Sequence, residues 1–159
     1  MRFILPTLFL LLINTLLCHN LLAQYRAEKP QNNNLYIDGG IYTKGLFSSV
    51  NYERRFFSIR NIHLHLYGKV GLGFIAIQRP DDRCGYGPNA SLNFLIGRKT
   101  HFLELETGGY LIPELCNNAG LTYLPNYLLG FRYQSRKHSL LLKGFVSLRG
   151  LGGGIGLSL

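Results

Sequence analysis

The feature that most constrains the fold is a strict two-residue alternation of apolar and polar residues. In HFLELETGGY (101–110), Leu103 and Leu105 fall on one face of an extended strand and Glu104 and Glu106 on the other. The same period recurs in segment after segment beyond the first 34 residues. Because this is the period of a strand and not of a helix, the sequence predicts an all-β chain.

The alternating segments are separated by Gly, Asn and basic residues, which favour turns. Several segments have the 9–11 residues that a tilted membrane strand needs. We expect eight strands, at about 35–43, 46–56, 62–75, 87–97, 101–111, 123–133, 139–147 and 152–159.

The two faces of these strands differ in composition. In 123–133, Leu129 and Phe131 oppose Gly130 and Arg132. Charged residues make up only 16% of the chain, against about a quarter in typical soluble proteins. A sheet in hydrocarbon must pair every backbone group and therefore has to close, and eight strands make a small barrel with a filled interior. The pattern predicts an eight-stranded antiparallel up-and-down membrane β-barrel over 35–159, with its apolar face toward lipid.

Charged residues on the other face should then point into the lumen. Isolated charges in a narrow interior are costly, so acids and bases there should pair. The predicted lumen charge network consists of Asp38, Glu53, Lys69, Glu104, Glu106, Arg132 and Lys143.

The first 23 residues have a short positive start, an apolar run and a small residue at Ala23, which is typical of a secretory signal peptide. Residues 24–34 are polar and predict a flexible lead-in segment. The net charge of +9 favours an anionic membrane surface or lipid head groups. Nucleic acid is not expected, because the chain is predicted to be exported and no basic run exceeds two residues.

Short links near 57–61, 98–100 and 134–138 alternate with longer ones near 76–86 and 112–122. Short periplasmic turns and longer outer loops are the usual barrel arrangement. Cys84 and Cys116 fall in the two long links, and an even pair in an oxidising compartment predicts a disulfide between those loops.

Tyrosines should mark the membrane interfaces, because aromatic girdles flank the apolar band of such barrels. The residues expected near strand ends are Tyr36, Tyr42, Tyr52, Tyr110, Tyr123, Tyr127 and Tyr133.

Three motifs could carry other chemistry. His63 and His65 lie two apart on one face, but a metal would need further ligands such as Glu53. His138 and Ser139 are adjacent, so their side chains point to opposite faces and cannot act as base and nucleophile. RGLGGGIG (149–156) precedes no helix and so predicts no phosphate loop. No cofactor, metal or catalytic residue is expected.

Three stretches carry a resemblance to a known family: NYERRF (51–56), GRKTHFLELE (97–106) and LGFRYQ (129–134). Over residues 46–159 the chain resembles small outer-membrane β-barrel proteins common in Bacteroidetes, a largely uncharacterised family. The resemblance implies an eight-stranded barrel and no catalytic residues. Such chains often end in an aromatic residue read by the barrel-insertion machinery, whereas this one ends in Leu159.

The favoured hypothesis is a small barrel of the cell outer membrane with a structural or interaction role. Its partners would be outer-membrane lipid, the barrel-insertion machinery and an extracellular partner at the outer loops. Two alternatives stay open: a secreted soluble β-barrel that binds an apolar ligand, and a lipid-A-modifying barrel enzyme.

Overall fold

The computed structural model describes residues 31–42, 45–59, 61–77, 83–113, 120–135, 137–148 and 150–159. The signal peptide predicted for 1–23 lies outside these residues, as does most of the lead-in segment. No helix long and apolar enough to cross a membrane occurs in the described residues.

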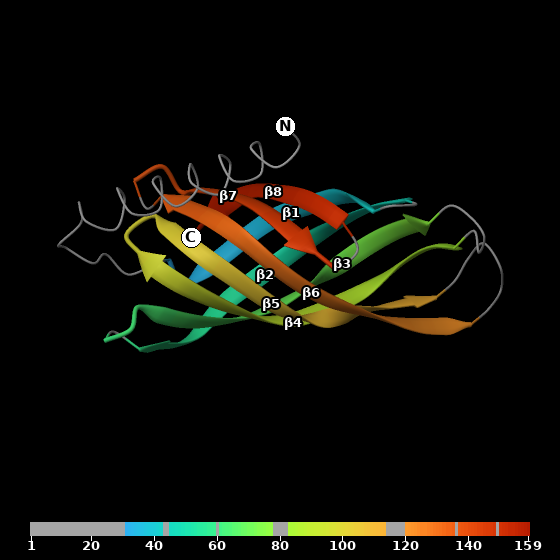
Figure 1. Cartoon of the computed structure of the whole chain (residues 1–159), viewed down its shortest axis with the longest axis horizontal. Coiled ribbons are helices and arrows are strands. Elements are labelled where there is room, and N and C mark those ends of the chain that lie inside the picture. The colour runs from blue at the N-terminus through green and yellow to red at the C-terminus, as the bar shows by residue number, and fades with distance from the viewer. Residues whose placement is uncertain are drawn as a thin grey trace, which may run out of the picture.

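Eight antiparallel strands form a closed barrel in sequence order, with β1 paired to β8 (Figure 1). This confirms the predicted eight-stranded all-β barrel. The strands are β1 (Asn33–Tyr42), β2 (Gly45–Ile59), β3 (Leu64–Ile77), β4 (Arg83–Arg98), β5 (His101–Pro113), β6 (Leu121–Ser135), β7 (Leu140–Ser147) and β8 (Gly150–Ser158).

The barrel has two unlike ends (Figure 1). The turn end carries the connections β2–β3, β4–β5 and β6–β7 together with the C-terminus, and the loop end carries the other four connections. At the turn end, His63, Lys99 and Ser139 have positive φ angles of 52°, 56° and 48°. Each of these three connections thus contains a residue with left-handed backbone conformation close to the start of the next strand. His63 and Ser139 directly precede β3 and β7, and Lys99 is separated from β5 by one residue.

Strands at the loop end are longer than predicted. The β3–β4 ladder continues to the pair Ile77 and Arg83, so β4 begins four residues earlier than the expected 87. Within the expected long link at 76–86, residues 76–77 therefore belong to β3 and residues 83–86 to β4. Backbone pairing continues beyond the last residues that clearly alternate between apolar and polar. One consequence is that Cys84 lies in β4, opposite Ala76, and not in a loop.

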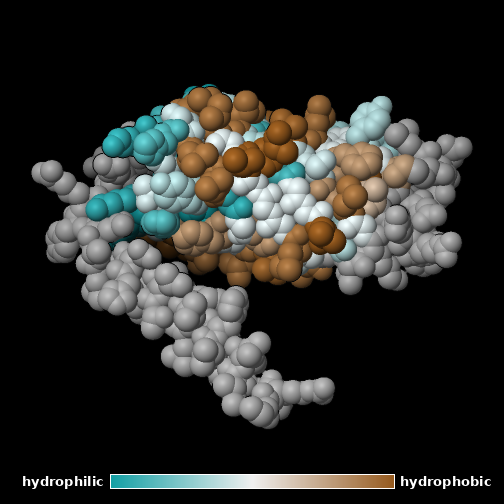
Figure 2. All heavy atoms as spheres, turned by 90° about the horizontal axis from the view of Figure 1, so that it is seen from above, coloured by the Kyte–Doolittle hydropathy of each residue, from teal (hydrophilic) through white to brown (hydrophobic). Residues whose placement is uncertain are grey.

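Side chains alternate between the two sides of the wall as the sequence predicted. Leu105 is 44% exposed, whereas Glu104 is fully buried. Every strand exposes large apolar side chains on its outer face, and Figure 2 shows them as a brown band across the middle of the barrel. A β-bulge between Arg55 and Phe57 shifts the register of β2, and Phe56 and Phe57 are both exposed.

Candidate functional site

The interior of the barrel holds a buried charge network. The strand period predicted its members, and the structure brings them together from β1 to β7. None is more than 6% exposed, and every one makes at least one ion pair: Asp38, Glu53, Lys69, Glu104, Glu106, Arg132 and Lys143.

Arg132 on β6 is the centre of the network. Its guanidinium donates from Nη1 and Nη2 to Glu53 at 2.6 and 3.1 Å, and from Nε and Nη2 to Glu104 at 3.1 and 2.6 Å. Both carboxylates are thus bound in the bidentate geometry that the planar fork favours. The arrangement ties β2, β5 and β6 together across the lumen.

The two lysines extend the network toward the loop end. Lys143 Nζ lies 3.1 Å from Glu104 Oε1, 3.5 Å from Asp38 Oδ2 and 3.7 Å from Glu106 Oε2. Lys69 donates to Glu106 Oε1. The ammonium of Lys143 also lies 4.9 Å from the centre of the Tyr36 ring, a cation–π distance.

Amide and hydroxyl groups that were not predicted as site residues complete the network. Asn93 donates to Glu53 at 2.5 Å, and Asn126 and Ser91 donate to Glu106 at 3.0 and 3.1 Å. Their inward position in the strand alternation was the available signal. Such groups supply the extra hydrogen bonds that buried carboxylates need.

Asn34 corrects the predicted lead-in segment. We expected it in flexible polar chain, but it lies in β1, fully buried. It donates to Glu53 at 2.9 Å and accepts from Gln134 and Ser158, each at 3.0 Å. Tyr67 likewise donates to the carbonyl of Gln31 at 2.7 Å. Residues 31–34, just before the expected strand start, are thus tied to the barrel by hydrogen bonds to lumen groups at Asn34 and to Tyr67 at Gln31.

The tyrosine girdle is wrong in part. Tyr36, Tyr42 and Tyr110 are at most 8% exposed and point inward, because they share the strand phase of the lumen residues. Tyr52, Tyr123 and Tyr127 face outward, exposed by 42%, 59% and 51%, and Tyr133 is half-buried.

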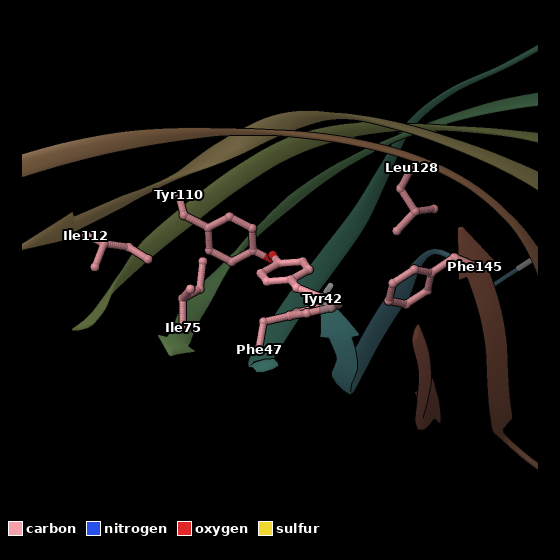
Figure 3. Close-up of a cluster of buried hydrophobic side chains, with 7 residues drawn as sticks. All are labelled: Tyr42, Phe47, Ile75, Tyr110, Ile112, Leu128 and Phe145. Atoms are coloured by element: carbon pink, nitrogen blue, oxygen red, sulfur yellow. The ribbon is translucent and has the colours of Figure 1, made fainter. Parts of the chain in front are cut away.

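An aromatic and aliphatic cluster fills the lumen at the loop end. Its side chains come from six strands, and Figure 3 shows them gathered inside the barrel wall. The rings of Tyr42 and Phe47 are stacked, with their centroids 4.9 Å apart. We name it the loop-end cluster: Tyr42, Phe47, Ile75, Tyr110, Ile112, Leu128 and Phe145. A smaller group, Tyr67, Leu95 and Phe102, lies near the turn end. Neither group was predicted, because large apolar residues were expected on the outer face.

The residues considered for other chemistry are not brought together. His63 lies in the β2–β3 turn, whereas His65 is buried, with Nδ1 2.7 Å from Ser58 Oγ. The expected shared face is therefore wrong, because the turn takes His63 out of the strand. His138 and Ser139 are exposed in a turn, as expected. No group of three His, Cys, Asp or Glu that could hold a metal occurs among the residues with described positions.

The predicted Cys84–Cys116 disulfide stays a prediction, because Cys116 lies outside the described residues.

Comparison with protein-family models, curated proteins and solved structures gives no match. The resemblance to the Bacteroidetes family therefore also stays a prediction.

Proposed function

We propose that the chain is an integral β-barrel of the outer membrane, with a sealed lumen and a structural or interaction role. The observation that carries this proposal is the inverted distribution of polarity. Charged groups at mid-height are buried inside the closed barrel, and large aliphatic and aromatic side chains face outward on every strand.

Such an outer surface is unsuited to water. Monomeric soluble proteins rarely expose contiguous apolar patches larger than a few hundred Å². Here the apolar outer residues adjoin one another across the strand ladders: Leu105 pairs with Leu129, and Leu129 with Val146, and all three are exposed by 44–56%. Lipid tails are the solvent that this band matches.

The filled interior supports a structural or interaction role over transport. The charge network occupies the middle of the lumen, and the loop-end cluster lies between it and the outer loops. A soluble barrel with an apolar ligand site would instead line its interior mainly with apolar residues. No specific observation favours the lipid-A-modifying alternative.

The loops at the loop end are the proposed contact surface for an extracellular partner. We propose that a Cys84–Cys116 disulfide ties the β3–β4 hairpin to the β5–β6 connection there. Support comes from the position of Cys84 at the loop end of β4 and from the presence of a single further cysteine beyond the predicted leader.

Membrane fractionation tests the proposal. An integral barrel should stay in the membrane pellet after carbonate and high-salt washes and dissolve only in detergent. In detergent, the folded barrel should migrate differently on gels before and after boiling. Release by carbonate alone, or a detergent-free soluble monomer, would contradict the proposal.

A further inference from the structure

We propose that a collar of cations around the turn end binds anionic phospholipid head groups. The cationic collar consists of Arg54, Arg98, Lys99 and Lys137. This inference deepens the proposed function and rests on it, because a lipid-facing collar requires that the barrel lie in a bilayer.

Topology brings these four residues to one end of the barrel. Arg54 lies five residues before the end of β2, opposite Asn33 at the start of β1. Arg98 ends β4, and Lys99 and Lys137 lie in the β4–β5 and β6–β7 turns. Arg54, Arg98 and Lys137 are exposed. Because β2, β4 and the β6–β7 turn are spread around the wall, the charges surround the end and do not form a single spot.

Two of the cations directly continue the outer apolar face. Arg54 follows Tyr52 by two residues, and Arg98 follows Ile96 by two, so each shares the strand face of an exposed apolar neighbour. Arg98 ends β4, so its guanidinium lies where the apolar face of that strand ends. That is the depth of lipid phosphates when the apolar band lies in lipid tails. On β2 the exposed Phe56 and Phe57 follow Arg54, so Arg54 lies within the outer part of the band.

No Asp or Glu side chain at the surface neutralises the collar within the described part of the chain. The acidic residues there are Asp38, Glu53, Glu104 and Glu106, and all four are buried in the lumen and at most 3% exposed. Figure 2 shows hydrophilic side chains gathered at the turn end, beside the brown band. Among the residues that the structure describes, charge is thus segregated: the acids pair inside the lumen, and Arg54, Arg98 and Lys137 are exposed toward the turn end.

A lipid surface fits these cations better than an acidic protein does. Arg54 and Arg98 point sideways from the wall, toward the surrounding membrane, and adjoin apolar residues that a soluble partner would not cover. Each Lys or Arg beside an anionic leaflet strengthens association by roughly fivefold. The attraction should weaken in salt, because exposed charges are screened.

Lipid selectivity in reconstituted vesicles tests the collar. The full chain is reconstituted in phosphatidylcholine with a trace of chain-spin-labelled phosphatidylglycerol or phosphatidylcholine, and the motionally restricted fraction gives the relative affinity of each lipid. We expect a preference for phosphatidylglycerol of about fivefold or more that largely disappears in 1 M NaCl. Replacing the collar by glutamine (Arg54→Gln, Arg98→Gln, Lys99→Gln, Lys137→Gln) should bring the preference close to unity.

A matched variant removes four charges from the stretches of sequence between β1 and β2, between β3 and β4 and between β7 and β8, and from the first residue of β4: Lys44→Gln, Arg79→Gln, Arg83→Gln and Arg149→Gln. It should keep the preference. Equal affinity of the wild type for both lipids overturns the collar, as does the same loss in both variants. Binding of soluble polyglutamate without lipid preference would replace it with an acidic protein partner. If neither lipid shows a restricted fraction, the proposed function itself fails.

Discussion

Arg132 Nη1 lies 2.6 Å from Glu53 Oε2, although the two residues are 79 positions apart in the chain. Both side chains are fully buried. The contact spans the lumen, because β2 and β6 are not neighbours in the barrel. It therefore depends on closure of the whole barrel and not on any single hairpin.

The first prediction concerns this contact. Arg132→Met should lower the free energy of unfolding by about 3–5 kcal/mol, because it leaves two buried carboxylates without their cation. Urea unfolding in detergent micelles, followed by the gel shift between folded and unfolded forms, measures the change. Arg98→Met at the exposed turn end is the matched control and should change little.

A compensating variant separates charge from shape. Adding Glu53→Gln and Glu104→Gln to Arg132→Met removes the uncompensated charges and should restore part of the lost stability. If the single Arg132→Met variant unfolds at the wild-type urea concentration, the network does not hold the barrel together as its geometry indicates.

How far the sequence predicts this fold follows from the period of a strand. Alternation assigned Glu104 and Leu105 to opposite sides, and counting the alternating segments gave eight strands. The charge network followed, because inward phase and the cost of an unpaired buried charge both select the same residues. These inferences are local, so they need no knowledge of which strands touch.

What the sequence did not predict depends on position along the barrel axis. Phe47 and Phe145 fill the lumen at the loop end in the same strand phase as Glu53 and Lys143, and alternation alone does not show where along the axis the interior changes from polar to apolar. The true ends of β3 and β4 were also not predicted, because the backbone pairing between Ile77 and Arg83 does not depend on an alternation of apolar and polar residues. Asn34 was assigned to a flexible segment because its partner, Glu53, is brought close only by the β1–β2 pairing.

The second prediction tests the outward face. Leu129→Arg should weaken folding into a bilayer by about 2–4 kcal/mol if this position lies near the membrane midplane. Leu129 is 51% exposed, so the same change on a soluble protein would cost little. Folding yield into vesicles, read from the heat-dependent gel shift, is the measurement. Leu129→Phe serves as the control and should fold normally; equal yields for both variants would argue that lipid does not contact this face.

The third prediction compares neighbours on opposite sides of the wall. Phe47→Ala should cost about 3–5 kcal/mol, because it opens a cavity in the loop-end cluster between Tyr42 and Phe145. Leu46→Ala, one residue earlier and 51% exposed, creates no interior cavity and should cost less. Both are measured by urea unfolding in the same micelles. A larger loss for Leu46→Ala would mean that the two faces have been interchanged.

The fourth prediction concerns Cys84 and Cys116. A bond between them would close a loop of about thirty residues, for which chain entropy gives about 3–4 kcal/mol. If the bond is present, Cys84 and Cys116 of the non-reduced protein should not react with maleimide even after unfolding in urea, and should react once a reductant is added. Reduction should also slow the migration of the unfolded protein on gels. Cys84→Ser should lower the stability of the oxidised protein to that of the reduced wild type. Reduction of the Cys84→Ser variant should then have no further effect, whereas two thiols that alkylate without reductant would refute the bond.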